Sequence, residues 1–239
     1  MKKIEEVAHN NYNSSDPWPN NDNWHEKTFK TINSYVKSWL SKNTKKDLTI
    51  LNVGSGKTSY NFKKLNIIYM DIIEDYVKNF DNYIVGSIDD IPLPNNSVDI
   101  IICVGSVINY TDALKSISEF HRILKNDGIL ILEFERSNSA EFLGTKNYLC
   151  PIFMKKYTYN NQEHLLWMYS ETYILSLMKS FHFQIINKYR FHTFSSLLYR
   201  LGLEDGKAAN YIKYDKYLNF ISYFLSHTII ITSQKINGS

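Results

Sequence analysis

Cysteine, glycine and proline are scarce in this sequence, and its net charge is small. Its 239 residues include 2 cysteines, 9 glycines and 5 prolines, and 27 basic side chains against 24 acidic ones give a net charge of +3. Cys103 and Cys150 provide neither a disulfide framework nor a cysteine zinc site, so we expect a reducing cytoplasm as the location. A charge of +3 is too small to require a polyanionic partner such as nucleic acid.

Long apolar runs and metal-binding motifs are also missing. The first eleven residues, MKKIEEVAHNN, lack the apolar core of a signal peptide. The most apolar stretch, residues 218–232, is interrupted by four polar residues and is too short for a membrane span. The 7 histidines form no HExxH motif or close pair, so we predict no metal site. These features together predict a soluble protein.

The most informative stretch is LTILNVGSGKTSY, residues 48–60. Its first half is a nearly continuous apolar run, which is typical of a strand buried on both faces of a parallel sheet. Gly54 and Gly56 then allow the backbone to turn tightly and to approach a ligand. We expect the amides of residues 55–58 to open towards that ligand at the start of a short helix, over about residues 57–64.

Two kinds of ligand fit such a turn. GSGKTS copies the end of the Walker A pattern, in which Lys57 would serve phosphates, but Leu51 holds the place of the first glycine. Asp99, moreover, stands at the start of its strand and not at the end. The other ligand is a nucleoside, whose ribose hydroxyls bond to an acid at the tip of the next strand. Residues 66–70 are that strand and Asp71 is its tip, although Asp71 can also be read as a helix cap.

From Asp71 onwards the order of signals resembles that of class I S-adenosylmethionine-dependent methyltransferases. VGSIDDIPLPNNSVDIIICVGSVINYTDALKSISEFHRILKNDGILILEFE, residues 85–135, is similar to the small-molecule, type 11 branch of that family. In that branch a G-D-a-x-x-L-P-f-x-x-x-S-F-D segment leads to an R-v-L-k-p-G-G turn. The resemblance covers about residues 48–135 and departs from the family pattern at four places. Asn52 replaces the acid of the first motif, Thr58 its third glycine, Ser87 the acid near the adenine, and Asn126-Asp127 the usual Pro-Gly.

The resemblance implies an α/β fold with a Rossmann-like, seven-stranded, mostly parallel sheet. Its strand order is 3-2-1-4-5-7-6, with the last strand antiparallel and helices on both faces. The apolar patterns place the third to seventh strands at residues 82–86, 98–104, 128–135, 183–191 and 227–233, and helices at 24–40, at 111–125 with Thr111 as N-cap, and at 170–181.

The other segments decorate this core. We expect a polar N-terminal arm over residues 1–23, as a loop or a partly ordered segment, ahead of a single domain over residues 24–239. Residues 137–161 are expected to form a loop. Residues 193–226 are expected to form a helical insertion that covers the acceptor pocket or makes a dimer contact.

The resemblance also implies where the methyl donor, S-adenosylmethionine, would bind. The donor-contacting residues carried over from the family are Asn52, Gly54, Ser55, Gly56, Asp71, Ile72, Ser87, Ile88, Cys103 and Val104. Ser87 and Ile88 would contact the adenine, and the end of the fourth strand would face the methyl group. A capped turn is the ordinary alternative for Ser87.

Residues for the acceptor end are harder to choose, because displacement at a sulfonium carbon depends mainly on near-attack geometry. For a hydroxyl acceptor, a base contributes about 10²- to 10⁴-fold. The candidates are Glu135, Tyr110 and His25, with His164 as a further possible base. Glu135 can equally be a solvated surface acid, and Tyr110 a packing residue. Trp24 and His25 belong either to a lid over the site or to an apolar plug at the sheet edge.

The sequence therefore predicts methyl transfer to an oxygen or nitrogen of a small-molecule, glycan or natural-product acceptor. Basic residues are scattered among acids, and the segments expected to cover the site are chiefly aromatic and aliphatic. We expect no nucleic-acid partner and allow for a homodimer. The alternatives are an RNA methyltransferase, a P-loop-type nucleotide-binding protein, or a catalytically inactive subunit that binds the donor.

Overall fold

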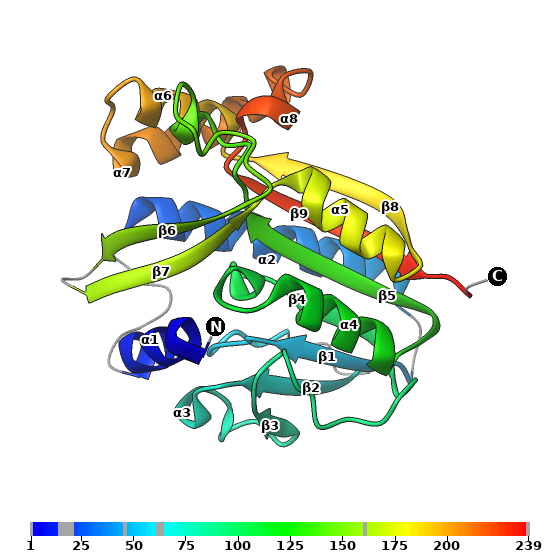
Figure 1. Cartoon of the computed structure of the whole chain (residues 1–239). Coiled ribbons are helices and arrows are strands. Elements are labelled where there is room, and N and C mark those ends of the chain that lie inside the picture. The colour runs from blue at the N-terminus through cyan, green and yellow to red at the C-terminus, as the bar shows by residue number, and fades with distance from the viewer. Residues whose placement is uncertain (1, 14–21, 45–46, 61–64, 160–161, 238–239) are drawn as a thin grey trace.

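The computed structural model describes residues 2–13, 22–44, 47–60, 65–159 and 162–237. Figure 1 shows its elements, which are α1 (Lys2–Asn13), α2 (Asn23–Asn43), β1 (Thr49–Val53), β2 (Asn66–Asp71), α3 (Glu74–Val77), β3 (Tyr83–Val85), β4 (Val98–Cys103), η1 (Val107–Tyr110), α4 (Ala113–Ile123), β5 (Leu124–Glu135), η2 (Ala140–Phe142), β6 (Ile152–Tyr159), β7 (Gln162–Tyr169), α5 (Glu171–Ser180), β8 (Phe183–Phe191), α6 (Thr193–Arg200), α7 (Asp205–Ala208), η3 (Ala209–Tyr217), α8 (Ser222–Leu225) and β9 (Thr228–Lys235).

Seven of these strands form one sheet in the order β3-β2-β1-β4-β5-β9-β8 (Figure 1). The first five are parallel to their neighbours, whereas β9 runs antiparallel to both β5 and β8. Since β8 and β9 are the sixth and seventh strands expected from the sequence, the predicted order and the antiparallel last strand are confirmed.

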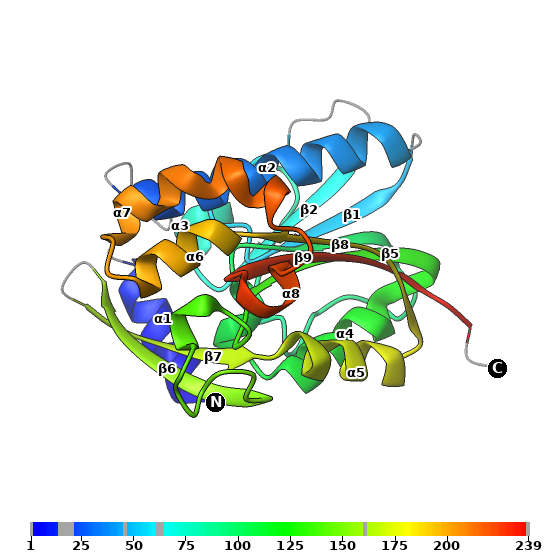
Figure 2. The same cartoon turned by 90° about the horizontal axis from the view of Figure 1, so that it is seen from above.

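Helices cover both faces of the sheet, as Figure 2 shows for α2 on one side and α4 and α5 on the other. Successive residues of a strand point to opposite faces, so Ile50 packs with the α2 side and Leu51 with the α4 side. This explains why β1 reads as a continuous apolar run. The N-cap of α4 is Asp112 and not Thr111, because the Asp112 side chain accepts a hydrogen bond from the Leu114 amide.

The N-terminal residues form a helix, α1, where the sequence predicted a loop or a partly ordered arm. Ile4 and Ala8 are buried, and the Asn11 amide donates to the Glu163 carbonyl at 2.7 Å. Ile4, Ala8 and Asn11 are spaced by four and three residues, so they lie on one face of the helix. This narrow face packs against the rest of the protein although the segment is mostly polar. Residues 14–21 lie outside the described residues.

The segment expected to be a loop, residues 137–161, instead leads into a second, two-stranded sheet. Strands β6 and β7 pair in antiparallel register from Ile152 with Tyr169 to Tyr159 with Gln162. Leu166 and Met168, which alternate along β7, are buried against Phe142. Aromatic and apolar residues on both sides of an Asn-Asn pair were the available sequence signal for this hairpin.

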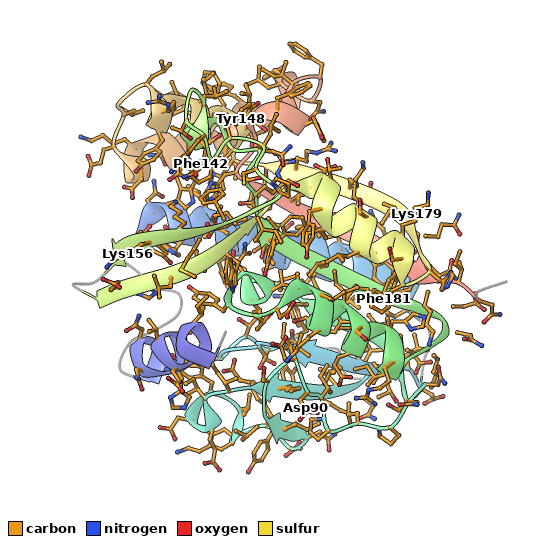
Figure 3. All side chains as sticks on the ribbon, in the orientation of Figure 1. Asp90, Phe142, Tyr148, Lys156, Lys179 and Phe181 are labelled. Atoms are coloured by element: carbon orange, nitrogen blue, oxygen red, sulfur yellow. The ribbon has the colours of Figure 1, made fainter. Side chains whose placement is uncertain are left out.

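Four short helices, α6, α7, η3 and α8, occupy residues 193–225 and lie together at one end of the molecule (Figure 1). They pack on the segment between β5 and β6, where Figure 3 labels Phe142 and Tyr148. The Tyr148 hydroxyl donates to the Phe224 carbonyl at 2.9 Å, and Arg200 donates to the Leu143 carbonyl at 2.9 Å. Residues 193–225 and the segment between β5 and β6 therefore form a single layer, which we call the cover.

A buried ionic cluster joins this cover to the main sheet. The guanidinium of Arg136, which follows β5, lies 2.5 Å from the Glu171 carboxylate, and both side chains have no exposed surface. Arg190 of β8 also pairs with Glu171 at 2.5 Å. Arg136 further donates to the carbonyls of Ser222 and Ser226, at 3.0 and 2.7 Å. Burial alone would raise the pKa of Glu171, but the bonds and charges of Arg190 and Arg136 hold it below the usual value.

Candidate active site

A pocket of about 1390 Å³, including its open mouth, lies at the carboxyl ends of the parallel strands. Ligands of open parallel sheets bind in this place. Twelve of the thirteen site residues predicted from the sequence line it: Asn52, Gly54, Ser55, Gly56, Asp71, Ile72, Ser87, Ile88, Val104, Tyr110, Glu135 and His25. The exception is Cys103, which is fully buried in β4 and is not among the described residues that line the pocket.

The glycine turn after β1 forms one wall of the pocket. Gly54 and Gly56 have φ angles of +58° and +53°, in the left-handed region that favours glycine. A Cβ atom on Gly54 would lie 2.2 Å from the Val107 side chain, so the turn is also in close contact with η1. Both glycines are therefore required by the backbone.

The helix expected over residues 57–64 is absent from residues 57–60, and residues 61–64 lie outside the described part of the chain. The side chain of Lys57 lies over the Tyr76 ring, 5.3 Å from its centre. Asp99 is at the opposite edge of the sheet, where it pairs with Lys125 at 2.9 Å. Neither the lysine nor the acid of the P-loop interpretation is thus placed for a phosphate and magnesium.

Asp71, at the tip of β2, is held rigidly beside the glycine turn. One carboxylate oxygen accepts from the Gly56 amide at 2.8 Å, and the other accepts from the Ile73 amide at 3.0 Å. Burial raises the pKa of Asp71, and these amides counteract that rise. Each oxygen keeps a further lone pair, so the carboxylate is available to ligand hydroxyls.

Glu135 lies at the other end of the pocket and is fixed by its backbone. The Asn109 side chain accepts from the Glu135 amide and donates to the Glu135 carbonyl, both at 3.0 Å. The Glu135 carboxylate lies 3.2 Å from Nε2 of His227. Burial would raise the pKa of Glu135, but the nearby His227 and the positive charge of Lys155 hold it at about 2. This acid is consequently a carboxylate at neutral pH.

His227 lines the same pocket and was not identified from the sequence, which placed it only at the start of a strand. Its Nδ1 lies 3.3 Å from the Ser139 hydroxyl and 3.6 Å from the Glu141 carboxylate. Glu141 in turn pairs with Lys155 at 2.7 Å. Because β9 is antiparallel to β5, its first residues meet the last residues of β5, with Glu135 opposite Thr228. The pairing register between β5 and β9 therefore brings His227 next to Glu135.

Helix α2 contributes its first turn to the pocket. Nδ1 of His25 lies 2.8 Å from the Asp22 carboxylate, which also caps the helix. The Trp24 ring stacks on His192 with 4.1 Å between ring centres and meets His227 edge-on at 5.5 Å. Trp24 therefore packs as part of the wall. His164 is buried in β7, stacked on Tyr157, and does not line the pocket.

Comparison with known proteins agrees with this geometry. Residues 51–132 match a family model described as a methyltransferase domain, and the fold is shared with many methyltransferase structures. The chain therefore has the fold of class I S-adenosylmethionine-dependent methyltransferases, and residues 51–132 are similar to the methyltransferase-domain family. The chain is 34% identical over 112 residues to an uncharacterized protein of Methanocaldococcus jannaschii, a match over 45% of this chain and 48% of that protein. The curated relatives that it matches are each covered over less than half of their length.

Two solved structures illustrate the shared fold. One is a putative S-adenosylmethionine-dependent methyltransferase from Listeria monocytogenes, with 11% identity, a TM-score of 0.61, and coverage of 89% of this chain and 98% of that one. The other is the Burkholderia thailandensis 1,6-didemethyltoxoflavin-N1-methyltransferase with bound 1,6-didemethyltoxoflavin and S-adenosylhomocysteine. It has 12% identity and a TM-score of 0.58, and the match covers 99% of this chain and 90% of that one.

S-adenosylmethionine is the donor that this class of enzyme uses, and the residues of the pocket fit it. The Asp71 carboxylate lines the pocket, where ribose hydroxyls could bond to it, and the glycine turn lines the same pocket. The side-chain amide nitrogen of Asn52 is buried in the pocket wall, and within the described residues nothing bonds to it. A buried polar atom without a partner is costly unless a ligand or water supplies one.

Metal-binding clusters and membrane-spanning helices are both absent from the described residues. Across residues 2–13, 22–44, 47–60, 65–159 and 162–237, no group of three or more His, Cys, Asp or Glu side chains could hold a metal ion. The helices within those ranges include none that is long and apolar enough to cross a membrane.

Proposed function

We propose that this protein transfers the methyl group of S-adenosylmethionine to an oxygen or nitrogen atom of a small-molecule, glycan or natural-product acceptor. One observation carries this proposal. A single pocket joins the donor-binding residues at one end to the Glu135 and His227 pair at the other. The donor supplies a methyl group on a sulfonium sulfur, whose positive charge makes the carbon electrophilic.

The donor end is assigned residue by residue. Asp71 would bond the ribose hydroxyls, and Ser87 and Ile88 would contact the adenine. Gly54 and Gly56 would let the backbone approach the amino-acid part of the donor. Holding the donor and acceptor in near-attack geometry supplies most of the rate for such a displacement.

At the acceptor end, Glu135 would take up a proton and His227 would position it. For a hydroxyl acceptor, the Glu135 carboxylate would accept the hydrogen bond of the hydroxyl and then its proton. As the carbon–sulfur bond breaks and the carbon–oxygen bond forms, the sulfonium becomes neutral S-adenosylhomocysteine, and the Glu135 carboxyl group then releases the proton to solvent. Nε2 of His227, 3.2 Å from the carboxylate, would hold it in place. Tyr110 and His25 would orient the acceptor.

The pocket walls favour a small acceptor over RNA. Besides the polar pair, this end is lined by Trp24, Phe29, Tyr110 and Tyr157, as is common in small-molecule sites. The Burkholderia thailandensis structural neighbour is named for methylation of a small-molecule nitrogen. An RNA methyltransferase and an inactive donor-binding subunit are the remaining alternatives. Closure of the arm, residues 1–23, over the donor and a homodimer contact through residues 193–226 stay predictions.

Methyl transfer from labelled donor tests the proposal directly. The full chain is incubated with S-adenosylmethionine carrying a labelled methyl group and with cell extract separated into small-molecule, RNA and protein fractions. We expect label in the small-molecule fraction, with little dependence on salt. Label chiefly in RNA, with an incorporation that falls steeply as salt is added, would show that the acceptor is a nucleic acid.

The donor site is tested by Asp71→Ala. A carboxylate bonded to ribose hydroxyls is worth roughly 1.5 to 3 kcal/mol, so S-adenosylhomocysteine affinity should fall about ten- to hundredfold, as measured by calorimetry. Circular dichroism of the ligand-free variant checks that the domain remains folded after the loss of the Asp71 bond to the glycine turn. Lys57→Ala is the matched control and should change the affinity little. Unchanged binding in Asp71→Ala would remove this residue from the donor site, and loss of Mg-ATP binding in Lys57→Ala would favour a P-loop function.

A further inference from the structure

Glu133 is a second buried acid close to the pocket, two residues before Glu135 on the same strand. It has no exposed surface. One carboxylate oxygen accepts from the amides of Gly105 and Ser106, both at 2.7 Å. Those two residues line the pocket at the end of β4. Glu133 therefore lies directly behind the turn that the ligand faces.

The strand register places this acid level with the glycine turn. Val53 of β1 pairs with Cys103 of β4, which pairs with Leu132 of β5. The next residue along each strand is Gly54, Val104 and Glu133 respectively, so the three stand in one row at the carboxyl edge. Side chains alternate between faces, so Glu133 shares a face with Asn52 and lies two residues further towards the carboxyl edge.

Two polar side chains on this face each contain an atom without a partner. The second carboxylate oxygen of Glu133 and the amide nitrogen of Asn52 are buried, and among the described residues nothing bonds to either. Asn52 occupies the place at which related methyltransferases carry an acid. Strand β1 thus carries no acid, whereas β5, on the other side of β4, carries one behind the Gly105–Ser106 turn.

We propose that Glu133 supplies the negative charge that selects the α-ammonium group of the methyl donor, in place of the acid that Asn52 replaces. This rests on the proposed function. Glu133 acts as a positioning residue, because its carboxylate fixes the amides of the Gly105–Ser106 turn and lends its charge to the ligand on the other side of that turn. A charge in a buried, water-poor site is felt over several ångströms, since little solvent screens it.

A purely structural role is the competing explanation, and it makes a different prediction. If Glu133 did no more than hold the turn, its loss would weaken every adenosyl ligand alike. If its charge selects the ammonium, the loss falls on ligands that carry this group. The experiment therefore compares S-adenosylhomocysteine with 5′-S-(3-carboxypropyl)-5′-thioadenosine, which is the same molecule without its amino group.

Titration calorimetry with Glu133→Gln measures the ratio of the two affinities. We expect the variant to lower S-adenosylhomocysteine affinity by roughly tenfold, the effect of one favourable charge contact, and to leave the amine-free ligand nearly unchanged. Glu204→Gln removes an exposed acid that does not line the pocket and should leave the ratio as in wild type. Equal weakening of both ligands by Glu133→Gln would overturn the proposal. Absence of S-adenosylhomocysteine binding to the wild type would instead overturn the proposed function.

A measurement on the wild-type protein covers the case in which the variant does not fold. Burial and the neighbouring Glu135 charge raise the pKa of Glu133 to about 7, against the lowering effect of the Ser106 and Gly105 amides. The charge of Glu133 also reaches Tyr60 and Cys103, and burial raises the pKa of both. A bound cation favours the ionised carboxylate, so S-adenosylhomocysteine should release protons near pH 7 and the amine-free ligand should not. Equal proton release for both ligands, from calorimetry in buffers of different ionisation enthalpy, would contradict the proposal.

Discussion

Replacing Glu135 by glutamine should lower the rate of methyl transfer to a hydroxyl acceptor by about 10²- to 10⁴-fold, the usual contribution of a positioned base. The amide has the same shape but takes up no proton at neutral pH. His227→Gln should lower the rate as well, because Nε2 of His227 lies 3.2 Å from the Glu135 carboxylate and holds it in place. The rate is measured as label transferred to the fraction that accepts methyl groups, at saturating donor.

Donor binding and acid stability provide the controls for Glu135→Gln. S-adenosylhomocysteine affinity should stay as in wild type, because the donor end of the pocket is unchanged. The folded state holds the pKa of Glu135 at about 2, against 4.5 normally. Its ionisation therefore stabilises the fold above pH 4.5, and this stability is lost as pH falls towards 2. Glu135→Gln should flatten that part of the stability curve. Full activity in the variant would remove Glu135 from the chemistry.

Replacing Glu171 by glutamine should lower the free energy of unfolding by about 3 to 5 kcal/mol, the usual cost of breaking a buried ion pair. The carboxylate is the shared partner of Arg136 and Arg190, and Arg136 has no exposed surface. Its removal leaves two guanidinium groups without a counter-charge between β5, β8 and α5. Urea unfolding followed by circular dichroism measures the change.

Glu204→Gln is the control for Glu171→Gln. Glu204 pairs with Lys207 at 3.0 Å, but both side chains are more than two-thirds exposed. An exposed pair contributes about 0 to 1 kcal/mol, because solvent screens it. A loss of less than about 1 kcal/mol in Glu171→Gln would show that the cluster does not depend on its carboxylate.

The part of the fold that the sequence predicted well is the part governed by local patterns. In β1, β4 and β5, apolar residues face helices on both sides, so each strand reads as an apolar run between turns. The glycine turn and Asp71 follow such runs directly, and this adjacency along the chain is why most of the predicted donor-site residues line one pocket.

The features that were missed depend on contacts between distant segments. In the hairpin β6–β7, Lys156 is exposed, whereas Lys155 lies over the Phe142 ring and pairs with Glu141. The two lysines therefore interrupt what would otherwise be an apolar pattern. Helix α1 buries few side chains and reads as polar. Cys103 belongs to the correct strand, but strand alternation turns it into the core and away from the pocket. His227 depends on the register between β5 and β9, which no local pattern encodes.

The reversed direction of β9 divides the chain into two parts that can change separately. Residues 49–135 build the glycine turn and the strand tips around the donor, and all of their strands run the same way. Residues 137–227 carry the hairpin, the edge strand β8, the helical cover and His227, and among the described residues they join the donor strands through β9, which pairs with β5. Insertions or replacements within this second part reshape the acceptor end without altering a strand that holds the donor. A lineage with this topology can therefore exchange one acceptor for another while inheriting its donor chemistry intact.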